Sequence, residues 1–196
     1  IDKDLKENVD AWKINVLGTK HIVDACKQTN KKIIFLSTDF VFEGTSKEGY
    51  TEEDVPRPIN WYGTTKYTGE KIVQAAGIPY TIVRISSPFR ANFEKKLDFA
   101  RIIKKRLEQK LPVNAITDHI MCPTFVDDIA FALKQLTEKE VTGIYHVVGS
   151  EQTSPYEGAI RIAEIFDLNT QLVTKTTREE YFRGRAKRPF NLALKQ

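Results

Sequence analysis

Three short, continuous apolar runs restrict the fold of this chain more than any other feature. They are KKIIFLS at 31–37, YTIVRIS at 80–86 and GIYHVVG at 143–149. Because such a run presents apolar side chains on both faces of a strand, it is typical of a parallel sheet that is covered on both sides. Helical patterns lie between the runs, and strands that alternate with helices need crossover connections. The sequence therefore predicts an α/β fold with a parallel sheet and helices on both faces.

The helices are placed by apolar residues that recur every three or four positions. We expect them over 10–28, 62–76, 95–109, 125–136 and 154–166. The last of these has Ser154 as its N-cap and Pro155 in its first turn. We also expect a loop at 41–60 and two further strands, LPVNAI at 111–116 and QLVTKT at 171–176.

Charge and composition argue against several classes of function. Thirty Lys and Arg residues against 26 Asp and Glu residues give a net charge of +4, and this mild excess is spread along the chain, which does not favour nucleic acid binding. No apolar run approaches the roughly 18 residues of a membrane-spanning helix. The three His residues lie near no Cys or carboxylate at ligand spacing, so we expect no metal site. Cys26 and Cys122 are interpreted as free thiols in a reducing compartment, which predicts a cytoplasmic protein.

The strongest local feature is a tyrosine and a lysine four residues apart, Tyr62 and Lys66. On a helix this spacing puts both side chains on one face, although it also occurs by chance in many helices. A nearby ammonium favours phenolate, and a phenol that ordinarily ionises near pH ~10 then exchanges a proton more readily. Thr38 ends the first apolar strand, where the loops of a parallel sheet meet ligands. We expect Thr38 and Tyr62 to share the oxygen of a carbonyl or alcohol at this edge.

Six segments along the chain also form a recognisable series. They are NVLGT at 15–19, STDFVFEG at 37–44, PINWYGTTKYTGE at 58–70, RISSPF at 84–89, CPT with DDIA within 122–130, and RPFNLAL at 188–194. In the same order they resemble segments of the extended short-chain dehydrogenases/reductases, and most closely those of the dTDP-4-dehydrorhamnose reductases. The STDYVFDG and PxxxYGxSKxxGE segments of that family are the nearest matches.

The resemblance implies hydride transfer from NADPH or NADH to C4 of a nucleotide-linked 4-keto-6-deoxysugar. Thr38 would hydrogen-bond the reacting oxygen, and Tyr62 would be the general acid. Lys66 would lower the pKa of Tyr62 and hold the hydroxyls of the nicotinamide ribose. The other site residues that the resemblance implies are Asn15, Ser37, Ser86 and Ser87 for the cofactor, and Phe40 and Arg188 for the sugar nucleotide, with Arg188 at its diphosphate.

For the fold, the resemblance implies a Rossmann-like sheet without its first strands and a small C-terminal substrate-binding lobe. Residues 1–90 would be the remainder of the NAD(P)-binding domain, and residues 91–196 would mix the lobe with the last Rossmann strand and helix. None of the ten glycines forms the GxxGxxG turn that cradles dinucleotide phosphates. We therefore expect a fragment that binds dinucleotide weakly. Its sheet edge and apolar face would lie uncovered, and a homodimer would be one way to cover them.

Two alternatives stay open beside the reductase. One is a sugar-nucleotide epimerase of the same superfamily, although epimerases more often show SSxxVYG than STDxVF. The other is a non-catalytic subunit that resembles the regulatory subunit of methionine adenosyltransferase. A dehydratase is disfavoured because Thr38 is followed by Asp39 and Phe40 instead of an Asp-Glu pair. Ser86 and Ser87 stand where rhamnose-forming reductases usually have a tryptophan, which leaves the sugar open.

Overall fold

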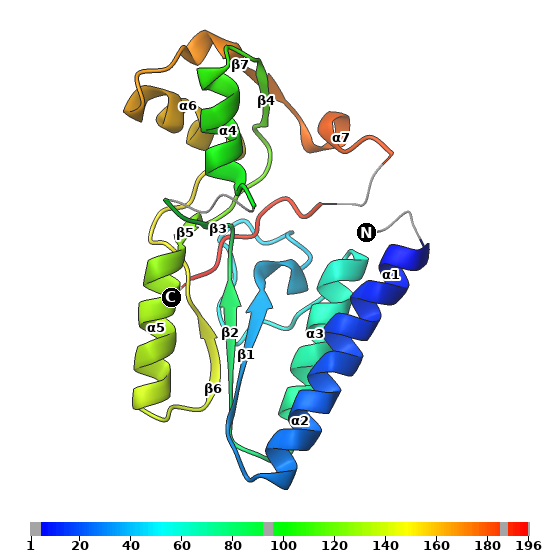
Figure 1. Ribbon diagram of the computed structural model, residues 1–196. Helices are drawn as coiled ribbons and strands as arrows, with labels where there is room; N and C mark the ends of the chain where they lie inside the picture. The colour runs from blue at the N-terminus through cyan, green and yellow to red at the C-terminus, as the bar shows by residue number, and fades with distance from the viewer. Residues whose placement is uncertain (1–4, 92–95, 185–187, 196) are drawn as a thin grey trace.

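The three apolar runs form one parallel sheet at the centre of the molecule (Figure 1). The computed structural model describes residues 5–91, 96–184 and 188–195. Strands β1 (Ile33–Thr38), β2 (Tyr80–Ile85) and β6 (Gly143–His146) lie in the order β1-β2-β6, and both pairs are parallel. The predicted parallel sheet is confirmed.

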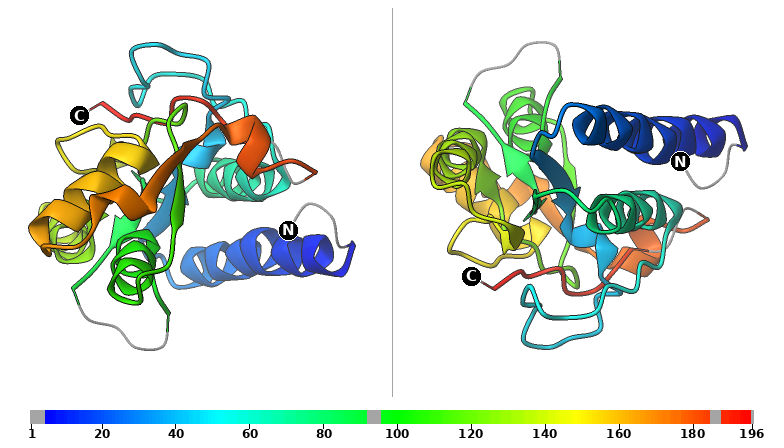
Figure 2. Two further views of the ribbon diagram at one scale, coloured as in Figure 1. Left: turned by 90° about the horizontal axis from the view of Figure 1, so that it is seen from above. Right: turned by 90° about the horizontal axis from the view of Figure 1, so that it is seen from below.

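Helices lie on both sides of this sheet (Figures 1 and 2). Helices α1 (Leu5–Trp12), α2 (Gly18–Gln28) and α3 (Trp61–Gln74) lie on one side, and α5 (Val126–Glu138) lies on the other. A buried cluster joins α2 and α3 to the sheet through Val23, Ile33, Val73, Ala76 and Ile82. In the described part of the chain, no helix combines the length and hydropathy needed to cross a membrane.

Strand β1 forms an open edge of the sheet. Among the described strands it pairs only with β2. Ile33 and Phe35 face the α2–α3 cluster, and because side chains alternate along a strand, Leu36 points to the opposite face. Leu36 is 42% exposed although it lies in the middle of the strand. The expected uncovered edge and apolar face are therefore present in this chain.

A second lobe is built on a separate two-stranded parallel sheet. Strands β4 (Val113–Ile116) and β7 (Val173–Thr176) form it. Helices α4 (Phe99–Glu108) and α6 (Pro155–Ile165) pack on it, and a 3-10 turn, η3 (Thr170–Leu172), precedes β7. As predicted, Ser154 caps α6, and it forms a reciprocal capping box with Glu157. How residues 1–90 and 91–196 divide into domains stays a prediction.

Short elements connect the two lobes above the carboxyl edge of the central sheet. Strands β3 (Pro88–Phe89) and β5 (Thr124–Phe125) pair with each other, and a 3-10 turn, η2 (Asp39–Val41), follows β1. After α7 (Arg178–Tyr181), residues 188–195 return to the first lobe, where Leu194 bridges to Tyr50. The tail and the segment after β1 then share one apolar core.

Some elements differ from the sequence prediction. The helix expected over 10–28 begins earlier, since α1 starts at Leu5 in the described residues. A π-helical turn, η1 (Lys13–Leu17), separates α1 from α2. The helix expected over 95–109 begins at Phe99, because the Asp98 side chain accepts from the amide of Arg101 and caps it. Its predicted start at Lys95 lies outside the described residues. The elements β3, β5 and α7 were not predicted, since two to four residues carry no periodicity.

Candidate active site

Thr38 lies at the carboxyl end of β1, as expected, and its hydroxyl is already engaged. Its Oγ1 donates to Oδ1 of Asp39 at 2.8 Å, and it accepts from the amide of Phe40 at 3.3 Å. Both Thr38 and Asp39 are buried. The second oxygen of Asp39 accepts from the Ser86 hydroxyl at 2.6 Å. The end of β1 is therefore linked to the end of β2 through one carboxyl group.

Tyr62 reaches the same edge from the first turn of α3. Asn60 caps this helix by accepting from the amide of Gly63 at 2.8 Å. The helix approaches the turn after β1 so closely that a Cβ at Gly63 would lie 2.1 Å from the carbonyl oxygen of Phe40. The ring of Tyr62 meets that of Phe40 edge to face at 5.9 Å. Glycine at this position is what allows Tyr62 to stand beside the β1 terminus.

The electrostatic setting of Tyr62 differs from the sequence expectation. Burial raises the pKa of its phenol, the interaction with the Thr38 side chain works in the opposite direction, and the negative charge of Asp39 adds to the rise. The net pKa shift is upward. The expectation that Lys66 lowers the pKa of Tyr62 is therefore wrong for this structure, because burial and the nearby carboxylate dominate.

Lys66 lies one turn after Tyr62 on α3 and is directed to the edge strand. Its Nζ donates to the carbonyl oxygen of Leu36 at 2.6 Å and lies 4.4 Å from the centre of the Phe35 ring. Burial lowers the pKa of the ammonium, and the charge of Glu70 opposes that shift. The predicted trio of Thr38, Tyr62 and Lys66 is thus brought to one end of β1, with Lys66 held by the strand backbone.

Asn15 stands behind α3. It lies in the π-helical turn η1, and its Nδ2 donates to Oγ1 of Thr65 at 3.0 Å. Thr65 in turn donates to the carbonyl oxygen of Tyr62 at 2.8 Å. Asn15 therefore reaches Tyr62 only through the backbone of α3. Its expected contact with a cofactor stays a prediction.

The three serines have different surroundings. Ser37 is buried, and its hydroxyl has no hydrogen-bond partner among the described residues. Ser86 is fully buried: it donates to Asp39 and accepts from the amide of Cys122 at 3.3 Å. Ser87, with a φ of 40°, donates to the sulfur of Met121 at 3.4 Å. The Ser86 hydroxyl is thus used in the hydrogen bond to Asp39 and is not exposed to a cofactor site.

Arg188 lies next to Phe40, and the expected contacts of both residues with substrate stay predictions. Its guanidinium carbon lies 5.2 Å from the centre of the Phe40 ring and 5.1 Å from that of Phe182. The backbone oxygen of Arg188 accepts from Arg178 at 2.9 Å. Since Phe40 also touches Tyr62, an exposed guanidinium is held between two rings within one aromatic contact of the tyrosine.

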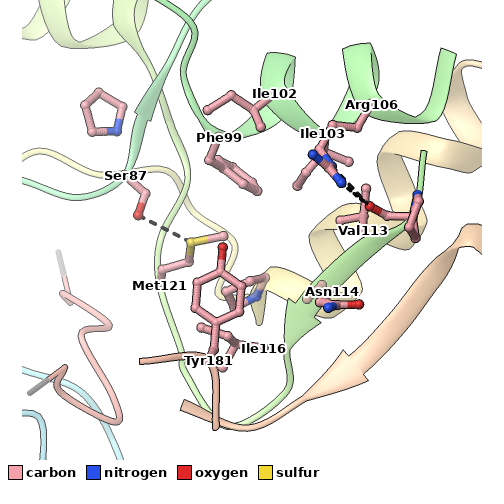
Figure 3. A pocket seen from close by; sticks show the side chains of 14 residues that line it. Ser87, Phe99, Ile102, Ile103, Arg106, Val113, Asn114, Ile116, Met121 and Tyr181 are labelled. Atoms are coloured by element: carbon pink, nitrogen blue, oxygen red, sulfur yellow. Dashed lines mark hydrogen bonds between the residues drawn. The ribbon is translucent and has the colours of Figure 1, made fainter. Parts of the chain in front are cut away.

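A cavity of about 620 Å³ opens between α4 and β4 of the second lobe. Figure 3 shows Phe99, Ile103, Met121 and Tyr181 around it, with the Ser87 hydroxyl directed at Met121. Ser87 directly follows Ser86, the partner of Asp39. The cavity therefore begins one residue along the chain from Ser86, whose hydroxyl binds the Asp39 carboxyl group, and its walls are mainly apolar.

Sequence reasoning missed two polar features of this region. Asp39 was used only to argue against a dehydratase. The other feature is a fully buried ion pair, in which Glu70 on α3 accepts from Nε and Nη2 of Arg84 on β2 at 3.0 and 2.7 Å. A signal existed for this pair, because an arginine within the apolar run YTIVRIS must find a partner if the strand is buried.

Comparisons with known proteins agree with this geometry. A family model described as RmlD substrate binding domain matches residues 1–196. Methionine adenosyltransferase 2 subunit beta of Xenopus laevis is 32% identical over 92% of this chain and 55% of its own length. The dTDP-4-dehydrorhamnose reductase of Sinorhizobium fredii is 32% identical over 85% of this chain and 58% of its own. The chain therefore spans little more than half the length of these curated relatives.

The fold is shared with a solved reductase. The crystal structure of dTDP-4-dehydrorhamnose reductase from Bacillus anthracis in complex with NADP superposes with a TM-score of 0.91 at 30% identity. The superposition covers 100% of this chain and 68% of the reductase chain. The Rossmann-like α/β fold predicted from the sequence is confirmed by this neighbour. By its sequence and its structure, the chain belongs to the RmlD substrate binding domain family.

Proposed function

We propose that this chain carries the proton-donating and substrate-binding part of an NAD(P)H-dependent reductase. The substrate would be a nucleotide-linked 4-keto-6-deoxysugar, reduced at C4, as in the dTDP-4-dehydrorhamnose reductases that the chain resembles. One observation carries the proposal: Thr38 and Tyr62 meet at the carboxyl end of β1, with Lys66 one helical turn from Tyr62. A partly buried phenol beside a strand-terminal hydroxyl suits proton transfer to a carbonyl oxygen.

The residues present fit the nicotinamide end of such a cofactor. The Lys66 ammonium has three N–H donors, and the Leu36 carbonyl uses one of them at the sheet edge where a ribose hydroxyl would lie. The ten glycines do not form the turn that holds dinucleotide phosphates, so these 196 residues do not supply a site for the phosphate end. When bound, NADPH or NADH would supply the hydride.

Tyr62 is the proton donor in this account. Burial raises its pKa, so the phenol is protonated at neutral pH. As the sugar's C4 gains a hydride, its oxygen gains the Tyr62 proton, and the C=O double bond becomes an alcohol. The phenolate that remains is then reprotonated from solvent. Burial makes the phenolate the less stable form, so it keeps Tyr62 protonated before the reaction and favours reprotonation of the phenolate afterwards.

The sugar nucleotide would lie between the two lobes. Arg188, held between Phe40 and Phe182, offers a guanidinium for the diphosphate. The apolar cavity of about 620 Å³ next to Ser87 is within the size range of small-molecule sites. Both lie on the side of the molecule where Thr38 and Tyr62 meet, which supports a substrate that spans the lobes.

The test uses the natural polypeptide with any residues that flank these 196. Given NADPH and a dTDP-4-keto-6-deoxysugar, it should oxidise the cofactor and release a 4-hydroxy sugar. Tyr62→Phe should lower kcat by about 10²–10⁴-fold, because the proton donor is lost. Tyr67→Phe, on the same helix, is the matched control and should retain activity. The proposal fails if the cofactor is not consumed, or if both variants lose activity equally.

A non-catalytic role is the second candidate, since a methionine adenosyltransferase subunit beta matches 92% of the chain at 32% identity. The natural polypeptide would then bind a methionine adenosyltransferase catalytic subunit in a pull-down and would oxidise no NADPH with the sugar. An epimerase, the third alternative, would convert the sugar without net consumption of cofactor.

A further inference from the structure

The backbone that carries Arg188 is held at three consecutive carbonyl groups. The oxygen of Arg188 accepts from Nη1 of Arg178 at 2.9 Å. The next two carbonyl oxygens accept from Nδ1 of His119 at 2.9 Å and from the amide of Ile120 at 2.8 Å. These donors come from α7 and from the loop after β4. Two segments of the second lobe therefore fix the tail at 188–190, where it returns to the first lobe (Figure 1).

Arg178 is itself anchored by one carboxyl group of that loop. The amide of Arg178 donates to Oδ1 of Asp118 at 2.6 Å, and its Nε donates to Oδ2 at 3.3 Å. Its guanidinium carbon lies 5.2 Å from the centre of the Phe190 ring. A guanidinium can bind Asp118 and the Arg188 carbonyl at once because its donors form a rigid planar fork, whereas a lysine ammonium is a compact point charge.

The Arg188 side chain depends on this backbone for its place. It is exposed, and its guanidinium lies between the rings of Phe40 and Phe182 at 5.2 and 5.1 Å. Phe182 directly follows α7, so the element that begins with Arg178 also supplies one of the two rings. A long side chain that is held before an anion arrives loses less conformational freedom on binding, which increases affinity.

We infer that Arg178 is a positioning residue, which acts through the backbone of Arg188 and sets the affinity of the site for a nucleoside diphosphate. The inference rests on the proposed role of Arg188 at the diphosphate of the sugar nucleotide. Nε and Nη1 of Arg178 are used in bonds to Asp118 and to the tail, so its effect passes through Arg188. The competing explanation is that Arg178 attracts the anion only by its charge.

Binding of dTDP to the natural polypeptide, measured by calorimetry, tests the inference. Arg188→Ala should raise the Kd about 10–100-fold, because hydrogen bonds from a charged donor are lost. Arg178→Lys keeps the charge but not the fork, so it should raise the Kd about 3–10-fold. Arg161→Lys is the matched control: Arg161 pairs with Glu151 on the surface of the same lobe, and the Kd should not change. An Arg178→Lys variant that binds dTDP as tightly as wild type overturns the inference.

Asp118→Asn tests the two explanations by sign. It removes a negative charge, so an effect of charge alone would make dTDP bind more tightly. The inference predicts weaker binding, because the amide nitrogen that replaces one carboxylate oxygen cannot accept from Nε of Arg178. Tighter binding in Asp118→Asn overturns the inference.

A double variant shows whether Arg178 acts through Arg188. In the Arg188→Ala background, Arg178→Lys should cause no further loss of dTDP affinity, since the group that it positions is already gone. General damage to the lobe would instead add to the loss. A further loss in the double variant, or a wild-type polypeptide that binds no dTDP, overturns the inference.

The binding test is separable from the proposed function, because it needs no hydride transfer. A polypeptide that binds dTDP but oxidises no NADPH refutes the reductase proposal, and the calorimetry still decides the role of Arg178. If activity is present, Arg178→Lys should raise the KM for the sugar nucleotide about 3–10-fold and leave kcat within about twofold, since binding is affected and the proton donor is not. A fall in kcat at unchanged KM contradicts a positioning role at the diphosphate.

Discussion

Three ionisable side chains at the end of β1 are shifted towards their neutral forms. Burial raises the pKa of the Tyr62 phenol, lowers that of the Lys66 ammonium, and raises that of the Asp39 carboxyl to about 6. Hydrogen bonds from Ser86 and Thr38 oppose the rise at Asp39 but do not cancel it. The site is thus shielded from solvent, so the charged form of each of these side chains is destabilised.

The Asp39 shift predicts a pH dependence of stability. In the unfolded chain the carboxyl ionises near its ordinary pKa of 3.8, and in the fold near about 6. Between these values the unfolded state alone releases the proton, so stability is lost as pH rises through this window and is constant above it. The free energy of unfolding, relative to that of Asp39→Asn, should fall by about 3 kcal/mol between pH ~4 and ~6.

Urea denaturation of both proteins at several pH values measures this difference. Asp54→Asn is a control of opposite sign: hydrogen bonds from the backbone and side chain of Thr51 lower the pKa of Asp54, so its stabilisation is present above the ordinary pKa and is lost as pH falls. A difference between wild type and Asp39→Asn that does not change with pH would mean that Asp39 is not buried as described.

At this scale the sequence identified the reactive residues but not their surroundings. Thr38, Tyr62 and Lys66 could be predicted, because a strand end and an i, i+4 spacing are local features. The environment of Asp39 could not be predicted, since it is formed by Ser86 and Cys122, which lie in distant segments of the sequence. The direction of the Tyr62 pKa shift was wrong for the same reason, because burial is a property of the folded chain.

Among the elements, α3 is the one that positions the site. It is held at Asn60 by its cap, at Gly63 by contact with the turn after β1, and at Glu70 by the buried pair with Arg84. Removing one partner of a buried ion pair leaves an uncompensated charge, so Glu70 and Arg84 fix the helix on the sheet. Tyr62 and Lys66 lie between these anchor points.

Gly63→Ala should disturb the site through this helix. The added Cβ would meet the Phe40 carbonyl oxygen at 2.1 Å, so α3 must shift, which costs about 1–3 kcal/mol and moves Tyr62. Gly158→Ala on α6 is the matched control. Its Cβ would meet Phe99 at 3.5 Å, an ordinary contact, and alanine favours a helix by about 0.5–1 kcal/mol. In urea denaturation the free energy of unfolding should therefore fall in Gly63→Ala and rise in Gly158→Ala. Equal changes in the two variants would contradict this account of α3.

The elements that were predicted are those with enough length to show a pattern. Strands β1, β2 and β6 and helices α3, α5 and α6 follow the expected positions to within a few residues. The π-helical turn η1 could not be foreseen, because it continues the apolar spacing of the helices on both sides. The pair β3–β5 depends on two residues from each of two distant segments.

For the whole molecule, the arrangement of the two lobes explains how distant motifs form one site. The tail at 188–195 returns from the second lobe to pack with Phe42 and Tyr50 of the first. That return places Arg188 beside Phe40. Strand β1 presents an open edge among the described strands and an exposed Leu36. The parallel sheet was predictable from three apolar runs, whereas the return of the tail was visible only in the folded chain.

The central claim is that this site directs a hydride to C4 of a sugar and a proton to its oxygen. NADPH or NADH deuterated at the transferred position, incubated with the natural polypeptide and a dTDP-4-keto-6-deoxysugar, tests it most directly. Proton and deuterium NMR should show deuterium at C4 of the product sugar, and Tyr62→Phe should form about 10²–10⁴-fold less of this labelled product in the same time. A product without deuterium at C4, or equal labelling by Tyr62→Phe, would contradict the claim.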